Sequence, residues 1–196
     1  MTKTKKITAA AVIIAIMLLF GFTPIGYIPL PFTKITLMCI PVIIGVMILG
    51  LKFGFLFSGI FILTSIYTFL TNPAPTSLIM FDYMPVMFIL CLIIPRVFIP
   101  ITTNAVYKAT VNKKPKLSYV LTAITGTLTN ALIFISIEQI FFAPALAKGL
   151  GLDMTGVTLA LWGVMLTNAL PETIAAVIVC LAVMTAINRK KKPLIQ

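Results

Sequence analysis

The most informative residues in this sequence are polar side chains that lie inside long apolar runs. Arg96 follows a proline in the run Ile93-Ile94-Pro95-Arg96-Val97. An arginine inside a membrane costs roughly 3 kcal/mol or more unless it faces the protein interior or water. It therefore requires an acceptor, which is either the anionic group of a solute or an internal partner. Glu172 and the carbonyls that the prolines free are the internal possibilities, and the sequence leaves both open.

Asn130 is predicted to lie at the same depth in the membrane as Arg96. At 1.5 Å per residue, Arg96 lies roughly 18 Å from the basic helix end at Lys108, and Asn130 lies roughly 20 Å beyond Leu117. Close helix packing at Gly126, one turn below Asn130, is the competing explanation for this segment. The matched depth favours a polar cavity shared by Arg96 and Asn130.

The last apolar run contains three more candidate residues and is interrupted by Pro171. We expect Asn168 to cap a helix that begins near Pro171, with Glu172 in its first turn at the positive end of the helix dipole. Residues 157–167 would then form a separate outer helix or lid. Trp162 is either an anchor at the membrane interface or an aromatic wall over a ligand.

Residues 22–32 form a loop that is too apolar for an ordinary solvent-exposed connection and that contains three prolines. A stiff apolar loop is suited to folding over an external pocket and excluding water, although it could also rest among the lipid head groups. Tyr27 is the polar contact that we expect this loop to offer a ligand.

The few acids and the lack of histidine argue against a catalytic role for this chain. It has no histidine, and its four acids are Asp82, Glu138, Asp153 and Glu172. We therefore predict no catalytic residues, no metal site and no cofactor. The three cysteines occur singly in separate apolar runs, which is typical of small core residues. A membrane enzyme or a scaffold subunit is the alternative of another class, and the absence of a nucleophile–base pair argues against it.

Helices within lipid are the elements that must position these residues. Apolar residues make up 60% of the 196 residues, only 10% are charged, and the mean hydropathy is +1.15. Such a chain requires lipid as its solvent, and its long unbroken apolar runs favour helices over barrel strands. We predict an all-α integral membrane protein with one domain over residues 1–196 and six transmembrane helices, at 7–22, 35–49, 53–70, 83–107, 117–142 and 157–187.

The distribution of cations predicts that both termini are cytoplasmic. Lys34 and Lys148 fall on the outer side of the six predicted spans, whereas twelve of the fifteen cations fall on the other side. Short loops rich in Lys and Arg stay in the cytoplasm, where anionic lipid head groups attract them. The net charge of +11 therefore does not indicate a nucleic-acid partner. The cytoplasmic set is Lys3, Lys5, Lys6, Lys52, Lys108, Lys113, Lys114, Lys116, Arg189, Lys190, Lys191 and Lys192.

The first apolar run carries Ala11 and Ala15, a pair of small residues four apart that lets another helix approach closely. That helix could belong to this chain or to another protein. Together with this pair, the order and spacing of several motifs resemble those of the substrate-binding S components of energy-coupling factor transporters. The motifs are the proline-rich loop before Ile40-Pro41-Val42-Ile43-Ile44-Gly45, then Leu49-Gly50-Leu51-Lys52-Phe53-Gly54, Leu63-Thr64-Ser65, Pro95-Arg96, Leu128-Thr129-Asn130 and Pro171-Glu172.

The resemblance implies a six-helix subunit of the bacterial cell membrane that captures a vitamin from outside and has no ATPase of its own. It also implies as partners a transmembrane coupling subunit and two ABC-type ATPases, with Ala11 and Ala15 as the docking face. The first loop would close the pocket, and the subunit would topple in the membrane during transport. Cys39 departs from the family, in which many members have histidine, and no role is transferred to it.

Pantothenate is the vitamin whose chemistry matches the candidate residues best. Its carboxylate would meet Arg96, its amide and hydroxyls would meet Asn130 and Asn168, and its dimethyl group would pack on Trp162 or Tyr27. Glu172 is a further candidate contact. The alternative is a neutral vitamin precursor, pyridoxine-like or a hydroxymethylpyrimidine, in a site where Glu172 neutralises Arg96.

Overall fold

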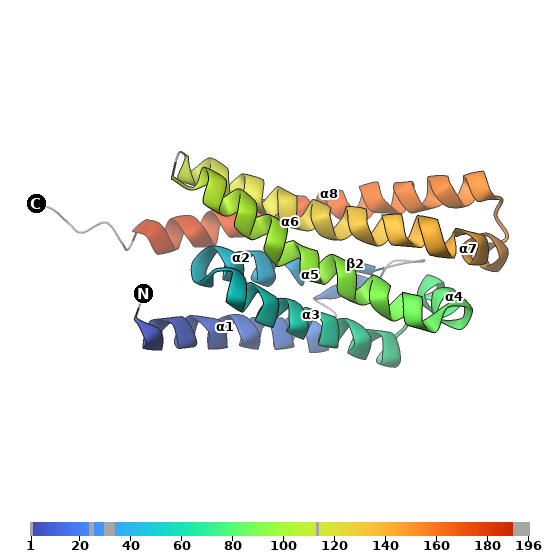
Figure 1. Ribbon diagram of the computed structural model, residues 1–196, viewed down its shortest axis with the longest axis horizontal. Coiled ribbons are helices and arrows are strands. Elements are labelled where there is room, and N and C mark those ends of the chain that lie inside the picture. The colour runs from blue at the N-terminus through green and yellow to red at the C-terminus, as the bar shows by residue number, and fades with distance from the viewer. Residues whose placement is uncertain (1, 24–25, 30–33, 113, 190–196) are drawn as a thin grey trace, which may run out of the picture.

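The computed structural model describes residues 2–23, 26–29, 34–112 and 114–189 of the chain. Helices dominate these residues, and one short hairpin interrupts them (Figure 1). In chain order the elements are α1 (Lys3–Phe22), β1 (Tyr27–Pro29), β2 (Lys34–Thr36), α2 (Cys39–Leu49), α3 (Leu51–Thr71), α4 (Pro75–Tyr83), α5 (Pro85–Thr110), α6 (Pro115–Ile137), the π-helical turn η1 (Glu138–Phe142), α7 (Ala143–Leu150) and α8 (Met154–Arg189).

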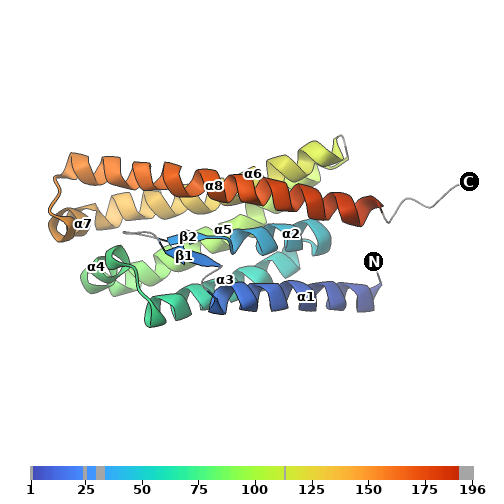
Figure 2. The ribbon, with the colours of Figure 1, turned by 180° about the vertical axis from the view of Figure 1, so that it is seen from behind.

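Five stretches of the described chain are long and apolar enough to cross a membrane, namely α1, α3, α5, the continuous run from α6 to α7, and α8. The sixth apolar helix, α2, has 11 residues and is roughly 16 Å long. That length is about half of a typical hydrocarbon core. The start of α1 and the end of α8 lie at the same end of the bundle in both views (Figures 1 and 2). The fold is therefore all-α with about six spans, as the sequence predicts.

The predicted start of the second span at residue 35 is wrong, because Ile35 lies in β2 and not in a helix. Strands β1 and β2 pair in antiparallel register, with Tyr27 opposite Thr36. Pairing between the two strands satisfies the backbone groups that face each other, which lowers the cost of a non-helical connection at this place. The rest of the predicted loop, at residues 24, 25 and 30–32, lies outside the described residues.

The predicted break near Pro171 is also wrong, because α8 runs from Met154 to Arg189 with Pro171 inside it. Asn168 is therefore not a helix cap, and residues 157–167 are the outer part of the same helix. The backbone groups freed by a proline in a membrane helix can be satisfied locally, and ending the helix in lipid would expose many more.

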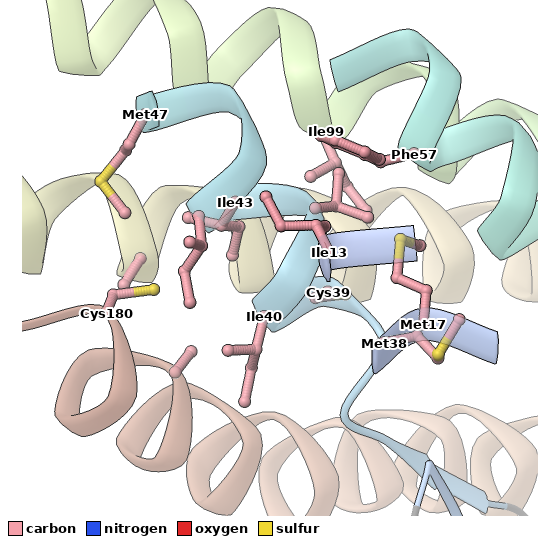
Figure 3. Packing of buried hydrophobic residues seen from close by; sticks show 14 of the residues in the cluster. Ile13, Met17, Met38, Cys39, Ile40, Ile43, Met47, Phe57, Ile99 and Cys180 are labelled. Carbon is pink, nitrogen blue, oxygen red and sulfur yellow. The ribbon is translucent and has the colours of Figure 1, made fainter. Parts of the chain in front are cut away.

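Helix α2 forms the centre of the bundle. Nine of its residues, from Cys39 to Met47, are buried. Figure 3 shows the α2 side chains among residues from four neighbouring helices: Ile13 and Met17 of α1, Phe57 of α3, Ile99 of α5 and Cys180 of α8. Helices α6 and α8 run together on one side of the bundle, and α1 and α3 run together on the other (Figures 1 and 2). We call this region, defined by α2 and its neighbours, the inner core.

Two glycines allow the helices around α2 to meet. Gly50 connects α2 to α3 with a φ of 86°, a left-handed conformation that favours glycine. At Gly126 of α6, an added Cβ would lie 2.6 Å from Cδ1 of Ile43 and 2.8 Å from Cγ2 of Thr103. The close packing that the sequence offered as an explanation for this segment is therefore present at Gly126.

Candidate solute-binding site

A cavity of about 160 Å³ lies between β1, α3, α5, the α6–η1 helix and α8. By volume it has room for on the order of ten water molecules, which matches a small organic solute. Five of the predicted site residues line it: Tyr27, Arg96, Asn130, Asn168 and Glu172. The cavity thus brings together side chains that are up to 145 positions apart in the chain.

Arg96 is buried in this cavity with a side-chain exposure of 6%. Its Nη1 donates to the backbone carbonyl of Cys91 at 3.2 Å. That carbonyl lacks its usual helical donor because the residue four positions later is Pro95. The proline therefore creates the acceptor that holds the arginine next to it.

Two aromatic rings cover the guanidinium group, and no carboxylate of the described residues forms an ion pair with it. The Cζ atom of Arg96 lies 5.0 Å from the ring centroid of Phe61 and 5.5 Å from that of Phe134. Such contacts favour a buried cation without neutralising it. The Nε atom has no hydrogen-bond partner. The site can therefore accept an anionic group such as a carboxylate.

The sequence left two internal partners open for Arg96, and the one that the structure contains is the hydrogen bond to the freed carbonyl of Cys91. Among the described residues, no ion pair joins Arg96 to Glu172. Glu172 is 4% exposed, and its Oε1 has no hydrogen-bond partner. Its carboxyl group instead lies close to the thiol of Cys39. Arg96 is consequently not neutralised by direct contact with this acid.

The two asparagines of the cavity are also incompletely satisfied. The Oδ1 atoms of Asn130 and Asn168 are buried without a hydrogen-bond partner. A buried polar atom without a partner costs roughly 1–3 kcal/mol, so such atoms are uncommon. Across the described residues seven buried side-chain atoms lack a partner, and four of them belong to residues that line this cavity: Arg96, Asn130, Asn168 and Glu172. This concentration is typical of a site that a polar ligand completes.

Tyr27 attaches the β1–β2 hairpin to α3 at the edge of the cavity. Its hydroxyl lies 3.2 Å from Oγ1 of Thr64 and 3.0 Å from Oγ of Ser65. Both of those hydroxyls also donate to the carbonyl of Phe61, at 3.0 and 2.8 Å. Burial raises the pKa of the Tyr27 phenol, so it remains neutral and able to donate. The Leu63-Thr64-Ser65 motif thus provides the anchor for the hairpin.

The other predicted residues lie away from the cavity. Trp162 is on the outer part of α8, is 44% exposed and does not line the cavity. Ala11 and Ala15 are exposed on α1, while Ala10, Ile13 and Met17 form the buried face of that helix. The alanine pair is therefore not used for packing within the described chain.

Several cavity residues were not among the candidates drawn from the sequence. The polar ones are Thr36 of β2, Ser65 and Thr68 of α3, Asn72 after it, Ser77 of α4 and Glu138 of η1. Glu138 could have been predicted from the sequence, because it lies eight residues after Asn130 and hence on the same face of a helix. Ser77 could not have been predicted, because the short helix α4 is not evident from hydrophobic periodicity.

Comparison with known proteins agrees with a solute-binding membrane subunit. The sequence model of the family described as "ECF transporter, substrate-specific component" matches residues 5–184. The chain is also 30% identical over 201 residues to the pantothenic acid transporter PanT of Lactococcus lactis subsp. cremoris (strain MG1363), an alignment that covers 97% of both proteins.

Proposed function

This chain belongs to the substrate-specific components of ECF transporters, and we propose that the vitamin it captures is pantothenate. As a member of that family it is a multi-pass protein of the bacterial cell membrane. The similarity to a pantothenic acid transporter over nearly the whole chain supports this choice of vitamin. The single observation that carries the proposal is the buried Arg96 with no ion-pair partner among the described residues.

The other polar groups of the cavity suit the remainder of pantothenate. With its carboxylate on Arg96, the amide and hydroxyls of the vitamin would reach the unpartnered oxygens of Asn130 and Asn168. Both oxygens accept hydrogen bonds, so N–H and O–H groups of the ligand complement them. Phe61 and Phe134, which contact the guanidinium, supply apolar surface around the bound carboxylate. A bidentate carboxylate on arginine also gives the site its selectivity for an anion.

The test compares pantothenate with pantothenol, which has an alcohol where the vitamin has its carboxylate. Titration calorimetry on the purified protein should show at least about 100-fold tighter binding of pantothenate, because a buried charge pair contributes on the order of 3 kcal/mol. Pyridoxine and thiamine serve as the neutral and cationic comparisons. Equal affinity for the vitamin and its alcohol, or preference for either comparison compound, would overturn the proposal.

Uptake would require partner proteins, and we propose a transmembrane coupling subunit with two ABC-type ATPases. Ala11 and Ala15 are the proposed contact, since both are exposed on α1 and small residues let helices approach closely. The subunit would capture the vitamin with its cavity facing outward and topple in the membrane to release it. Replacing both alanines by leucine should abolish copurification with the coupling subunit and leave pantothenate affinity unchanged. Retained copurification would contradict this docking face.

A neutral vitamin precursor is the alternative ligand. Such a ligand has no carboxylate, so the charge of Arg96 would have to be neutralised by a residue of the protein. That reading draws on Glu172, yet no ion pair between these two residues occurs in the described part of the chain. The alternative makes a distinct prediction. If Arg96 and Glu172 are replaced together by leucine and glutamine, a neutral ligand should still bind, whereas pantothenate should not.

A further inference from the structure

One face of the α6–η1 helix follows the length of the cavity. Asn130, Phe134 and Glu138 are spaced four residues apart, and all three line the cavity. At 1.5 Å per residue, Glu138 lies roughly 12 Å along the helix from Asn130. The three side chains therefore present an amide, an aromatic ring and a carboxyl group in sequence along a path of roughly the length of a small extended solute.

Glu138 is placed by a change of helix type. It is the first residue of the π-helical turn η1, and Pro144 follows at the start of α7. Because a proline has no N–H and its ring clashes with the preceding turn, the helix must depart from regular α-helical bonding just before it. The N–H of Glu138 still bonds the carbonyls of Phe134 and Ile135, so the residue is held at the end of α6. Single π-helical turns are frequent at functional sites.

Glu138 is a buried residue of the cavity, and its carboxyl group has no bonded partner in the described part of the chain. Its side chain is 6% exposed, and within the described residues no hydrogen bond or ion pair to its carboxyl oxygens occurs. It lies one helical turn beyond Phe134, whose ring contacts the Arg96 guanidinium. Glu138 therefore lies close to the part of the cavity that holds Arg96, and a ligand bound on the arginine would lie within reach of its carboxyl group.

We propose that Glu138, together with Asn130 and Asn168, binds the hydroxyl groups of the solute whose carboxylate lies on Arg96 and so determines specificity. A carboxyl oxygen accepts a hydrogen bond from a hydroxyl whether the group is ionised or protonated. The cavity would then bind its ligand through two groups of opposite chemistry: the Arg96 cation for the carboxylate and the Glu138 acid for a hydroxyl. This inference rests on pantothenate, or a close relative of it, being the ligand.

The test measures how much the ligand hydroxyls contribute to binding in each protein variant. The two ligands are pantothenate and an N-acyl-β-alanine with the same carbon skeleton, carboxylate and amide but without hydroxyls. The variants are Glu138→Ala and the isosteric Glu138→Gln. The control is Gln139→Ala, since the adjacent Gln139 donates to Oγ1 of Thr158 at 3.1 Å and does not line the cavity.

The Glu138→Ala variant should bind pantothenate about tenfold more weakly than the natural protein. Its affinity for the deoxy compound should change by less than about twofold, because that ligand has no group to lose. Glu138→Gln should keep part of the discrimination, since its amide oxygen still accepts a hydrogen bond. If the alanine variant does not fold, the glutamine variant carries the test with the same two ligands. Gln139→Ala should behave as the natural protein does.

Two results would overturn the inference. An equal loss of affinity for both ligands would mean that Glu138 acts on the structure or on Arg96. No loss for either ligand would mean that the hydroxyls bind elsewhere. If the natural protein binds neither pantothenate nor its deoxy analogue, the proposed function itself fails, and this result is distinct from the other two.

Discussion

The inner core and the cavity both bury polar side chains, but they satisfy them differently. In the inner core, Thr103 donates to the carbonyl of Ile99 at 2.6 Å. The hydroxyl of Thr127 lies 2.9 Å from that of Thr173 on α8. In the cavity, one side-chain oxygen each of Asn130, Asn168 and Glu172 has no partner. Among the described residues, one oxygen each of Ser58, Thr122 and Gln139 also lacks a partner, but none of these three residues lines the cavity.

The difference follows from the chemistry of the side chains. A threonine or serine in a helix can donate to a carbonyl three or four residues earlier, so it satisfies itself without help from another element. An asparagine, glutamate or arginine in a helix reaches further and presents more donors or acceptors than its own helix can meet. Hydroxyls such as those of Thr103 and Thr127 are therefore satisfied by packing, whereas the unpartnered amide and charged groups that line the cavity indicate the solute.

Arg96→Ala is the change for which we expect the largest loss of ligand affinity. We expect pantothenate to bind at least about 100-fold more weakly, because the variant removes the cation that would pair with the carboxylate. Pantothenol affinity should change far less. The matched control is Thr103→Val in the inner core, which should lower thermal stability and leave affinity unchanged. Titration calorimetry on both variants checks the result, and a similar loss of affinity in both would show that the two regions are not distinct.

Gly126→Ala is a change in the inner core that should lower stability and leave ligand affinity unchanged. The added methyl group would meet Ile43 and Thr103, and such overpacking typically costs about 1–3 kcal/mol. Thermal unfolding in detergent should therefore shift downward, while the folded fraction keeps its affinity for pantothenate. Gly163→Ala is the control, since an added Cβ there meets nothing within 4 Å and alanine favours a helix. Equal stability of the two variants would refute close packing at Gly126.

A smaller effect is expected for Asn130→Ala in the cavity. Loss of one hydrogen bond to the ligand should weaken pantothenate binding about tenfold. The neighbouring Thr129→Ala is the control, since Oγ1 of Thr129 lies 3.0 Å from that of Thr102 and Thr129 does not line the cavity. The control should change affinity by less than about twofold. If Thr129→Ala weakens binding as much as Asn130→Ala does, the cavity does not mark the site.

Much of the cavity could be predicted from the sequence because depth in a membrane follows from counting residues along a helix. Arg96 and Asn130 were predicted at one level, and they line the same cavity. The freed carbonyl at Cys91 follows from Pro95 in the same way. Glu138 was not found, although its spacing from Asn130 was available. Residues on α4 and in the α3–α4 connection could not be found, because no periodic signal places such short segments.

The fold could be predicted where apolar runs were long. It could not be predicted where a local sequence pattern is compatible with two structures. The break at Gly50 was predicted and is present, since glycine there adopts a positive φ. Pro171 signals a helix end in water, yet α8 continues through it. Ile35 belongs to an apolar run that suggests a helix, yet it pairs with β1 across the hairpin. In both cases the deciding factor is the tertiary surroundings, which satisfy backbone groups that a single segment cannot.

Trp162→Ala is the change for which we expect the smallest effect, and it tests where the cavity ends. Because Trp162 is 44% exposed and does not line the cavity, its loss should alter pantothenate affinity by less than about twofold. It is the single tryptophan of the chain, so intrinsic fluorescence reports on it alone. Brominated lipids should quench that fluorescence if the ring anchors α8 at the membrane interface, and pantothenate should not. Quenching by the vitamin together with a tenfold loss of affinity would instead mean that the outer part of α8 moves over the bound ligand, and the boundary between cavity and lipid would then have to be redrawn.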